Sequence, residues 1–185
     1  MSSKDVFSTL ISHNKGPAVE KIIEQILISQ MIPSSFWLNE PNIKNLGKKN
    51  RYYQTLYLFC YGTWNDYLNN KDKYILLDEP KIQQLKLLTL IEISKNRKEL
   101  SYSELKLLLD IKENFQLEKI LFTAFNKGFL TGNVDGEKEI IHIISVCPRQ
   151  NLKETKLVKN QIEQWIRNLE NSETFIDDKC RELSK

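Results

Sequence analysis

The stretch from Lys81 to Val146 restricts the fold more than any other part of the sequence, because it carries in turn the patterns of three helices and a hairpin. Apolar residues recur at every third or fourth position at its start, which predicts a first helix buried over a broad face. The residues of that face are Ile82, Leu85, Leu87, Leu88, Leu90 and Ile91. Ser101 and Glu104 have the spacing of a capping box, so a second helix should begin at Ser101. The residues predicted for its core face are Leu105, Leu108 and Leu109.

A third helix and two strands complete this stretch. The helix should begin near Asn114 and end at Gly128, since glycine readily adopts the left-handed conformation that stops a helix. Its predicted core face consists of Leu117, Ile120, Leu121, Ala124 and Phe125. Two strand patterns, Phe129–Val134 and Glu139–Val146, flank Asp135-Gly136, a dipeptide that strongly favours a tight hairpin turn. The order of three helices and a hairpin predicts a winged helix.

A winged helix either binds nucleic acid through its third helix or assembles with other proteins, and the charges favour assembly. A helix that reads DNA needs several Arg or Lys residues on its exposed face, because phosphate neutralisation dominates the affinity. The predicted third helix carries Lys119 and Lys127 but also Glu118, and Glu113 lies directly before it. We therefore expect a subdomain used for protein contact, with nucleic-acid binding as the less favoured alternative.

The last predicted strand is apolar at positions that point to both of its faces. A strand of this kind is usually covered on both sides, whereas an exposed edge strand usually carries charged residues. We therefore expect this strand to lie in a contact with another protein at the sheet edge. The predicted contact residues are Ile141, Ile143 and Ile144.

Residues 1–80 carry the patterns of several short helices. A helix is expected around Val6–Ile11, and a second should begin at Pro17, because proline fits the first helical turn. The apolar face of the second is Val19, Ile22, Ile23, Ile26 and Leu27. A later helix should place Tyr53, Leu56, Tyr57 and Cys60 on one side and end at Gly62. Thr63 and Asp66 then have capping-box spacing for one more short helix. This succession of short helices predicts helical-repeat hairpins.

A long helix is predicted for the C-terminal part, residues 149–185. Its apolar residues follow spacings near 3.5, the repeat of helices that pack along a seam. These predicted contact residues are Val158, Ile162, Trp165, Leu169, Ile176 and Leu183. A helix of about 30 residues would be roughly 45 Å long, and the preceding residues would form a body only about 37 Å across. Part of the helix should therefore project from the body and pack in a bundle with helices of partner proteins.

The residue types needed for catalysis are sparse. His13 and His142 are the two histidines, and neither has Cys, Asp or Glu at the spacing of metal ligands or of a catalytic triad. Glycine-rich phosphate-binding loops are absent from the sequence, and the three cysteines lie far apart. We expect neither an enzyme nor a bound metal or cofactor, and we expect a soluble protein inside the cell without a signal peptide or membrane span.

Composition agrees with a mostly α protein, because five prolines and six glycines in 185 residues are few for a fold of many short strands. The net charge of +3 is small and implies no particular polyanionic partner. We predict helical-repeat hairpins in residues 1–80, a winged-helix subdomain in residues 81–148 and a long helix in residues 149–185.

The sequence resembles the PCI-domain family of scaffold subunits, which occur in the proteasome lid, the COP9 signalosome and translation initiation factor three. Within it, the resemblance is greatest to the group of seventh subunits of the signalosome. The stretches that carry it are Pro41–Leu46, Phe59–Leu68, Leu85–Leu90, Leu100–Leu105 and Gly132–Asp135. Tyr61-Gly62-Thr63-Trp64 is the most specific of these motifs. The chain departs from the group at Cys147-Pro148-Arg149, where a Gly-Arg-Asp turn is usual.

The resemblance implies a non-catalytic subunit of the complex that removes the ubiquitin-like modifier Nedd8 from cullins, with the catalytic metal in another subunit. It also implies partners that join through winged-helix sheets and through a bundle of C-terminal helices, in the cytoplasm and nucleus. Two alternatives stay open. One is a PCI subunit of the proteasome lid or of initiation factor three, and the other is a winged-helix adaptor that binds nucleic acid.

Overall fold

Residues 3–29, 31–149, 159–169 and 172 are those that the computed structural model describes. The chain divides into two units, Met1–Gln150 and Asn151–Lys185. The further division of the first unit at residue 80 stays a prediction. The first unit consists mostly of helices with one small antiparallel sheet, as the sequence led us to expect.

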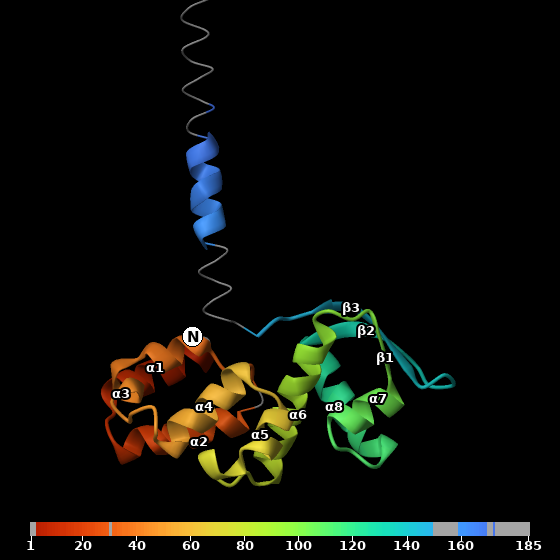
Figure 1. Ribbon diagram of the computed structural model, residues 1–185, viewed down its shortest axis with the longest axis horizontal. Helices are drawn as coiled ribbons and strands as arrows, with labels where there is room; N and C mark the ends of the chain where they lie inside the picture. Colours follow the sequence, from red (N-terminus) through yellow and green to blue (C-terminus); the bar gives the residue numbers. More distant parts are fainter. Residues whose placement is uncertain (1–2, 30, 150–158, 170–171, 173–185) are drawn as a thin grey trace, which may run out of the picture. The chain divides into compact units, whose positions relative to one another are not determined.

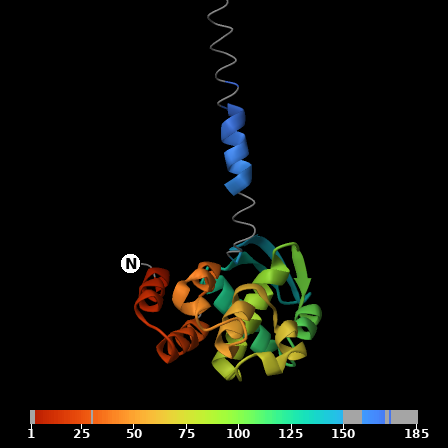
Figure 2. The same cartoon turned by 60° about the vertical axis from the view of Figure 1, so that its left-hand side comes forward.

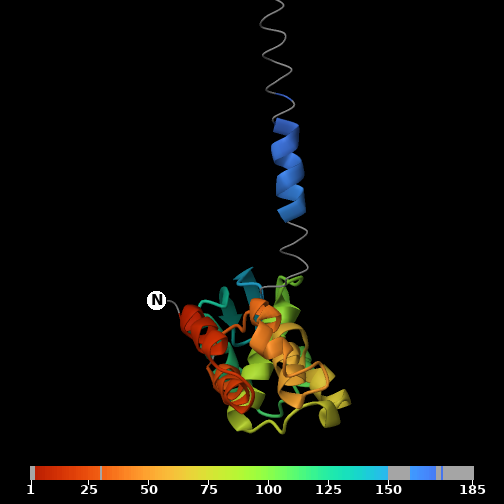
Figure 3. The ribbon, with the colours of Figure 1, turned by 90° about the vertical axis from the view of Figure 1, so that its left-hand side faces the viewer.

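Short helices make up the N-terminal half of the first unit. They are α1 (Ser3–His13), α2 (Pro17–Ile28), η1 (Ser35–Asn39), α3 (Pro41–Lys44), α4 (Arg51–Tyr61), α5 (Trp64–Asn69) and η2 (Lys71–Lys73). The predicted face of α2 is buried in full, and Pro17 occupies its first turn. The face predicted for α4 was partly wrong, because Tyr57 is exposed and Leu58 and Phe59 are buried. Figures 2 and 3 show these helices from two further directions, with α1 and α2 (red) facing the viewer in Figure 3.

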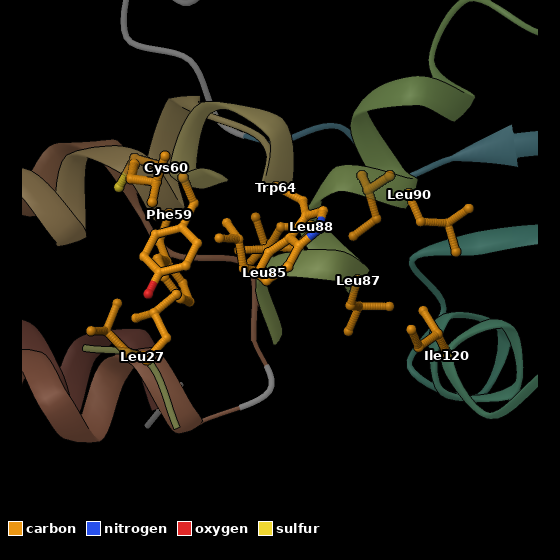
Figure 4. Close-up of a cluster of buried hydrophobic side chains, with 14 of the residues drawn as sticks. Leu27, Phe59, Cys60, Trp64, Leu85, Leu87, Leu88, Leu90 and Ile120 are labelled. Carbon is orange, nitrogen blue, oxygen red and sulfur yellow. The ribbon is translucent and has the colours of Figure 1, made fainter. Parts of the chain in front are cut away.

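Helix α6 (Glu79–Ser94) lies between these helices and the remainder of the first unit (Figure 1). Its buried residues lie around most of the helix and leave one partly buried sector at Ile82, Lys86 and Ile93; they are Gln84, Leu85, Leu87, Leu88, Thr89, Leu90, Ile91 and Ser94. Figure 4 shows Leu85 and Leu88 on the side of Phe59, and Leu87 on the side of Ile120 from α8. A helix with buried residues around most of its circumference must pack against more than one neighbour. The broad face predicted from the sequence is therefore shared between two sets of neighbours.

The second half of the unit combines two helices with a sheet. Its elements are β1 (Glu99–Ser101), α7 (Tyr102–Leu108), α8 (Asn114–Asn126), β2 (Leu130–Asp135) and β3 (Ile140–Val146). The strands pair antiparallel in the order β1-β3-β2, so β3 is the central strand of the sheet. Strand β1 was not predicted, because three residues are too few to show an alternating pattern. It pairs with β3 through Leu100 and Ile141.

The helix boundaries in this half follow the predicted caps. The Ser101 hydroxyl accepts a hydrogen bond from the Glu104 amide at 3.2 Å, so α7 begins where the capping residue predicted. Gly128 has a φ of 67° and ends α8 in the left-handed conformation. The predicted core face of α7 was wrong at Leu108, which is exposed. Helix α7 ends at that residue, and the other two predicted residues, Leu105 and Leu109, are fully buried.

The hairpin turn differs from the predicted one. Asp135 pairs with Ile140, so four residues connect the strands, where a tight turn on Asp135-Gly136 was expected. The Asp135 carboxylate accepts hydrogen bonds from the amides of Glu137 and Lys138, at 3.1 and 3.0 Å. This side chain holds a wider turn, and Glu139, with a φ of 52°, takes the left-handed conformation expected of the glycine.

A joint of polar contacts connects the end of β3 with α6 and the α4–α5 turn. Arg149 is 2% exposed; its Nη1 donates to the Gly62 carbonyl at 2.8 Å and its Nε to the Glu92 carboxylate at 2.9 Å. On the other side of Gly62, the predicted capping box of Thr63 and Asp66 is present. The Trp64 amide donates to the Thr89 hydroxyl at 2.8 Å. The motif singled out as most specific therefore serves as a structural joint.

The charge of Glu92 depends on this joint. Burial alone would raise the pKa of its carboxyl group, but hydrogen bonds and positive charge from Lys95 and Arg149 outweigh burial and lower the pKa. A lowered pKa means that the folded state prefers the ionised form. Ionised Glu92 therefore stabilises the fold above the ordinary value of 4.5, and this contribution disappears as the pH falls through the lowered pKa.

We expect Leu88→Ala to reduce the free energy of unfolding by about 2–5 kcal/mol, because it removes a fully buried side chain from α6 and leaves a cavity. Urea unfolding is the measurement. Leu107→Ala is the matched control, since Leu107 is exposed and its truncation should change stability by less than about 0.5 kcal/mol. Equal effects of the two substitutions would contradict the central position of α6.

We expect Glu92→Gln to lower the free energy of unfolding by about 1 kcal/mol at neutral pH, a value that allows for solvent screening of a partly exposed carboxylate. The difference from the unchanged protein should vanish in acid, where Glu92 itself is protonated. Unfolding in urea across a pH series measures it. Glu118→Gln, at an exposed position of α8, is the control. A difference that persists below pH 3 would show that charge is not the cause.

Candidate protein-interaction surface

Strand β3 places the three predicted contact residues in three different environments. Ile141 is 1% exposed and belongs to the core of its own unit, so its predicted role as a direct contact residue was wrong. Ile143 is half-buried against that core. Ile144 is 75% exposed and is the one of the three that is available to a partner. The apolar character of β3 is thus explained largely by folding of the chain itself.

A β-bulge at Ile144 places two successive residues of β3 on the exposed side. Thr131 pairs with Ser145 and Gly132 with Ile143, so Ile144 is an extra residue without a partner on β2. A side chain at Gly132 would collide with the His142 carbonyl group, which makes glycine necessary where the strands approach at the bulge. The bulge breaks the inside-outside alternation of the strand, and this explains why Ile143 faces the core while Ile144 and Ser145 are exposed.

The edge of β3 that β1 does not reach is open within the described residues. Strand β1 pairs with residues 140–142 of β3, and the Ile143 amide donates to the Lys98 carbonyl at 2.7 Å. Beyond this bond lies a hollow of about 460 Å³. Ile144, Ser145, Pro148, Arg97 and Lys98 are among its lining residues. Among the described residues, the open edge of β3 is therefore limited to the last residues of the strand, and a protein contact there stays a prediction.

Residues 159–169 of the second unit are helical and present a continuous apolar stripe to solvent. Its members, at one- and two-turn spacing, are Ile162, Trp165, Ile166 and Leu169. All four are about half exposed or more, and Trp165 reaches 67%. The stripe includes three of the predicted contact residues and adds Ile166, which the 3.5-residue spacing did not select. The predicted residues Val158, Ile176 and Leu183 lie outside the described part of the chain.

The charges near the sheet and α8 are mixed. Lys119 and Lys127 share α8 with Glu118, and the hairpin turn carries Glu137 beside Lys138. His142 Nδ1 lies 3.2 Å from the Glu99 carboxylate, on the exposed face of the sheet. Alternating charges of this kind do not form the positive surface that phosphate binding requires.

Side chains suited to catalysis are not gathered anywhere in the described residues. Groups of three or more His, Cys, Asp or Glu residues that could hold a metal ion are absent from this part of the chain. Burial raises the pKa of the Cys60 thiol to about 12, against the opposing charge of Arg149, which leaves it a poor nucleophile. Among the same residues, none of the helices has the length and apolar character to cross a membrane.

Three proteins named COP9 signalosome complex subunit 7 are similar to this chain. The protein of Dictyostelium discoideum is 30% identical over 143 residues, which are 74% of this chain and 54% of that protein. The protein of Arabidopsis thaliana is 28% identical over 179 residues, 94% of this chain and 67% of the relative. The protein of Drosophila melanogaster is 27% identical over 143 residues, 74% of this chain and 50% of the relative.

The match covers between half and two thirds of the length of these relatives. No family model matches the sequence. The three relatives come from distant organisms, have the same name, and align with most of this chain. This confirms the resemblance predicted from the motifs: most of this chain is similar to COP9 signalosome subunit 7 proteins.

Proposed function

We propose that this chain is a non-catalytic scaffold subunit of a COP9 signalosome and that it supports the removal of Nedd8 from cullins by holding other subunits together. The observation that carries the proposal is the similarity to subunit 7 proteins of the signalosome over 74–94% of the chain. The lack of a candidate metal cluster among the described residues agrees with this role.

The proposal includes a PCI domain. The elements α6, β1, α7, α8, β2 and β3 follow one another in the order of a winged helix, with the short strand between the first two helices. This order supports a winged-helix subdomain over residues 81–148, preceded by the helical hairpins of residues 1–80. The tightly packed α6 would join the two parts into one rigid scaffold, because its side chains pack against both.

The helix at residues 159–169 is the proposed main assembly surface. Burying one large apolar side chain contributes roughly 1.5–3 kcal/mol, and Ile162, Trp165, Ile166 and Leu169 are all exposed on it. An exposed apolar stripe of this size is typical of a contact site. Partner helices that cover it would form a bundle with this helix, packed along the apolar residues that the sequence spacing predicts. The exposed Ile144 on β3 is the proposed second contact.

The first prediction from this proposal concerns the partners. Affinity purification of the chain from its native cells should recover other signalosome subunits, and the recovered complex should remove Nedd8 from cullins although this chain alone does not. Mass spectrometry of the eluate identifies the partners. A chain that instead co-purifies with proteasome-lid or initiation-factor subunits would belong to another scaffold. Recovery of nucleic acid without protein subunits would contradict the scaffold role.

The second prediction concerns the stripe. Trp165→Glu should reduce the recovery of partner subunits at least tenfold, because a carboxylate replaces the largest exposed apolar side chain in the seam. The thermal midpoint of the isolated protein should change little, since Trp165 is already 67% exposed. Gln164→Glu introduces the same charge on the opposite side of the helix and is the matched control. Equal recovery with both variants would show that the stripe is not a contact.

A further inference from the structure

A groove runs between α6 and α8 on a part of the first unit that uses neither residues 159–169 nor β3. Two hollows, of about 230 and 450 Å³, make up this groove. They have Glu79, Gln83, Lys119 and Ile120 in common, so they are continuous with each other. The smaller hollow extends to Ile28 at the end of α2, and the larger one to Phe115 in the first turn of α8.

The groove has an apolar floor and apolar ends. Leu87 and Ile120 form the floor where α6 packs against α8 (Figure 4). At one end the Phe115 ring is 74% exposed, and at the other Ile28 is about half exposed. Large apolar side chains at both ends of a groove give an occupant two anchor points. Folding of the described residues leaves them uncovered.

The larger hollow has four charged side chains, of which two are paired and two, Lys119 and Glu113, have no partner among the described residues. The Lys86 ammonium donates to the Asp110 carbonyl at 2.8 Å, and the Glu79 carboxylate accepts from Gln83 at 3.0 Å. The Lys119 ammonium and the Glu113 carboxylate form no hydrogen bond or ion pair within the described part of the chain. Glu113 is the N-cap residue at the start of α8 and Lys119 lies six positions further along, a rise of about 9 Å along the helix.

A third group at the groove also lacks a partner. Gln84 is 2% exposed, and its Nε2 donates to the Met31 carbonyl at 2.7 Å. Its Oε1 is buried without a hydrogen-bond partner, although Gln84 lines the smaller hollow. Buried polar atoms are nearly always paired in folded proteins. This oxygen is buried in the groove wall, so an N–H or O–H group from an occupant would reach it only after the surrounding side chains shift.

We propose that the groove between α6 and α8 binds one amphipathic helix of a partner protein. The helix carries a carboxylate opposite Lys119 and a cationic side chain opposite Glu113, about two turns apart, with an apolar side chain between them. Two helices already form the walls of the groove, and a third helix fits such a seam with its apolar face inward. This inference adds a third partner surface to the proposed scaffold and does not depend on which complex the chain enters.

The test is a photo-crosslinking experiment on the full chain in its native cells. The photoreactive residue p-benzoylphenylalanine replaces Phe115 in the groove or, as the matched control, Phe122. Both positions lie on α8 and are similarly exposed, at 74% and 66%, but Phe122 lines neither hollow. We expect position 115 to react with one helical segment of another protein that has the stated pair of charges, and position 122 to leave that segment unmodified.

Charge reversal then tests the pairing. Lys119→Glu should reduce the crosslink yield at position 115 at least tenfold, and replacing the facing carboxylate of the identified helix by Lys should restore it. Lys127→Glu makes the same charge change at an exposed position beyond the groove and should have no effect.

Three outcomes overturn the inference: no product at position 115, a product within this chain, or a partner segment without the pair of charges. Since the label reports on the groove in any assembly, failure to recover signalosome subunits would overturn the scaffold proposal and leave this test intact.

Discussion

The burial of α6 against two sets of neighbours is the constraint on which the rest of the first unit depends. Leu85 and Leu88 pack toward the N-terminal helices while Leu87 packs toward α8, so a single helix supplies core residues to both halves. Protein interiors are close-packed and transmit displacement rather than absorb it. The two halves are therefore held in one arrangement by the rigidity of a helix, without a large interface of their own.

Polar contacts fix the positions of the chain after β3 and of the α4–α5 turn relative to α6, which apolar packing alone does not determine. Arg149 holds the chain after β3 against Glu92 of α6 and the Gly62 carbonyl, and the Trp64 amide bonds to Thr89 on α6. A buried guanidinium group requires such partners, because burial of an unpaired charge is strongly unfavourable. The end of β3 and the residues up to Arg149 are consequently held against α6 and the α4–α5 turn.

The surfaces left after folding are consistent with a role in assembly. Apolar side chains stay exposed on residues 159–169, at Ile144 and along the groove between α6 and α8, whereas the charges on α8 alternate in sign. Large apolar surface in contact with water favours association with other proteins. The similarity to signalosome subunits and the exposure of these side chains therefore support the same conclusion by separate arguments.

The sequence by itself determined the helices and their ends, because apolar spacing and capping residues act within a few residues along the chain. Val19 to Leu27 of α2, Ser101 at the start of α7 and Gly128 at the end of α8 were all predicted correctly. Trp165 and its neighbours were also recognised as a stripe. Only the tertiary structure decided features that join distant segments: the pairing of β1 with β3, the bulge of β3 opposite Thr131 and Gly132, and the contacts of Arg149. Those features depend on pairings between residues far apart in the sequence, which local patterns do not encode.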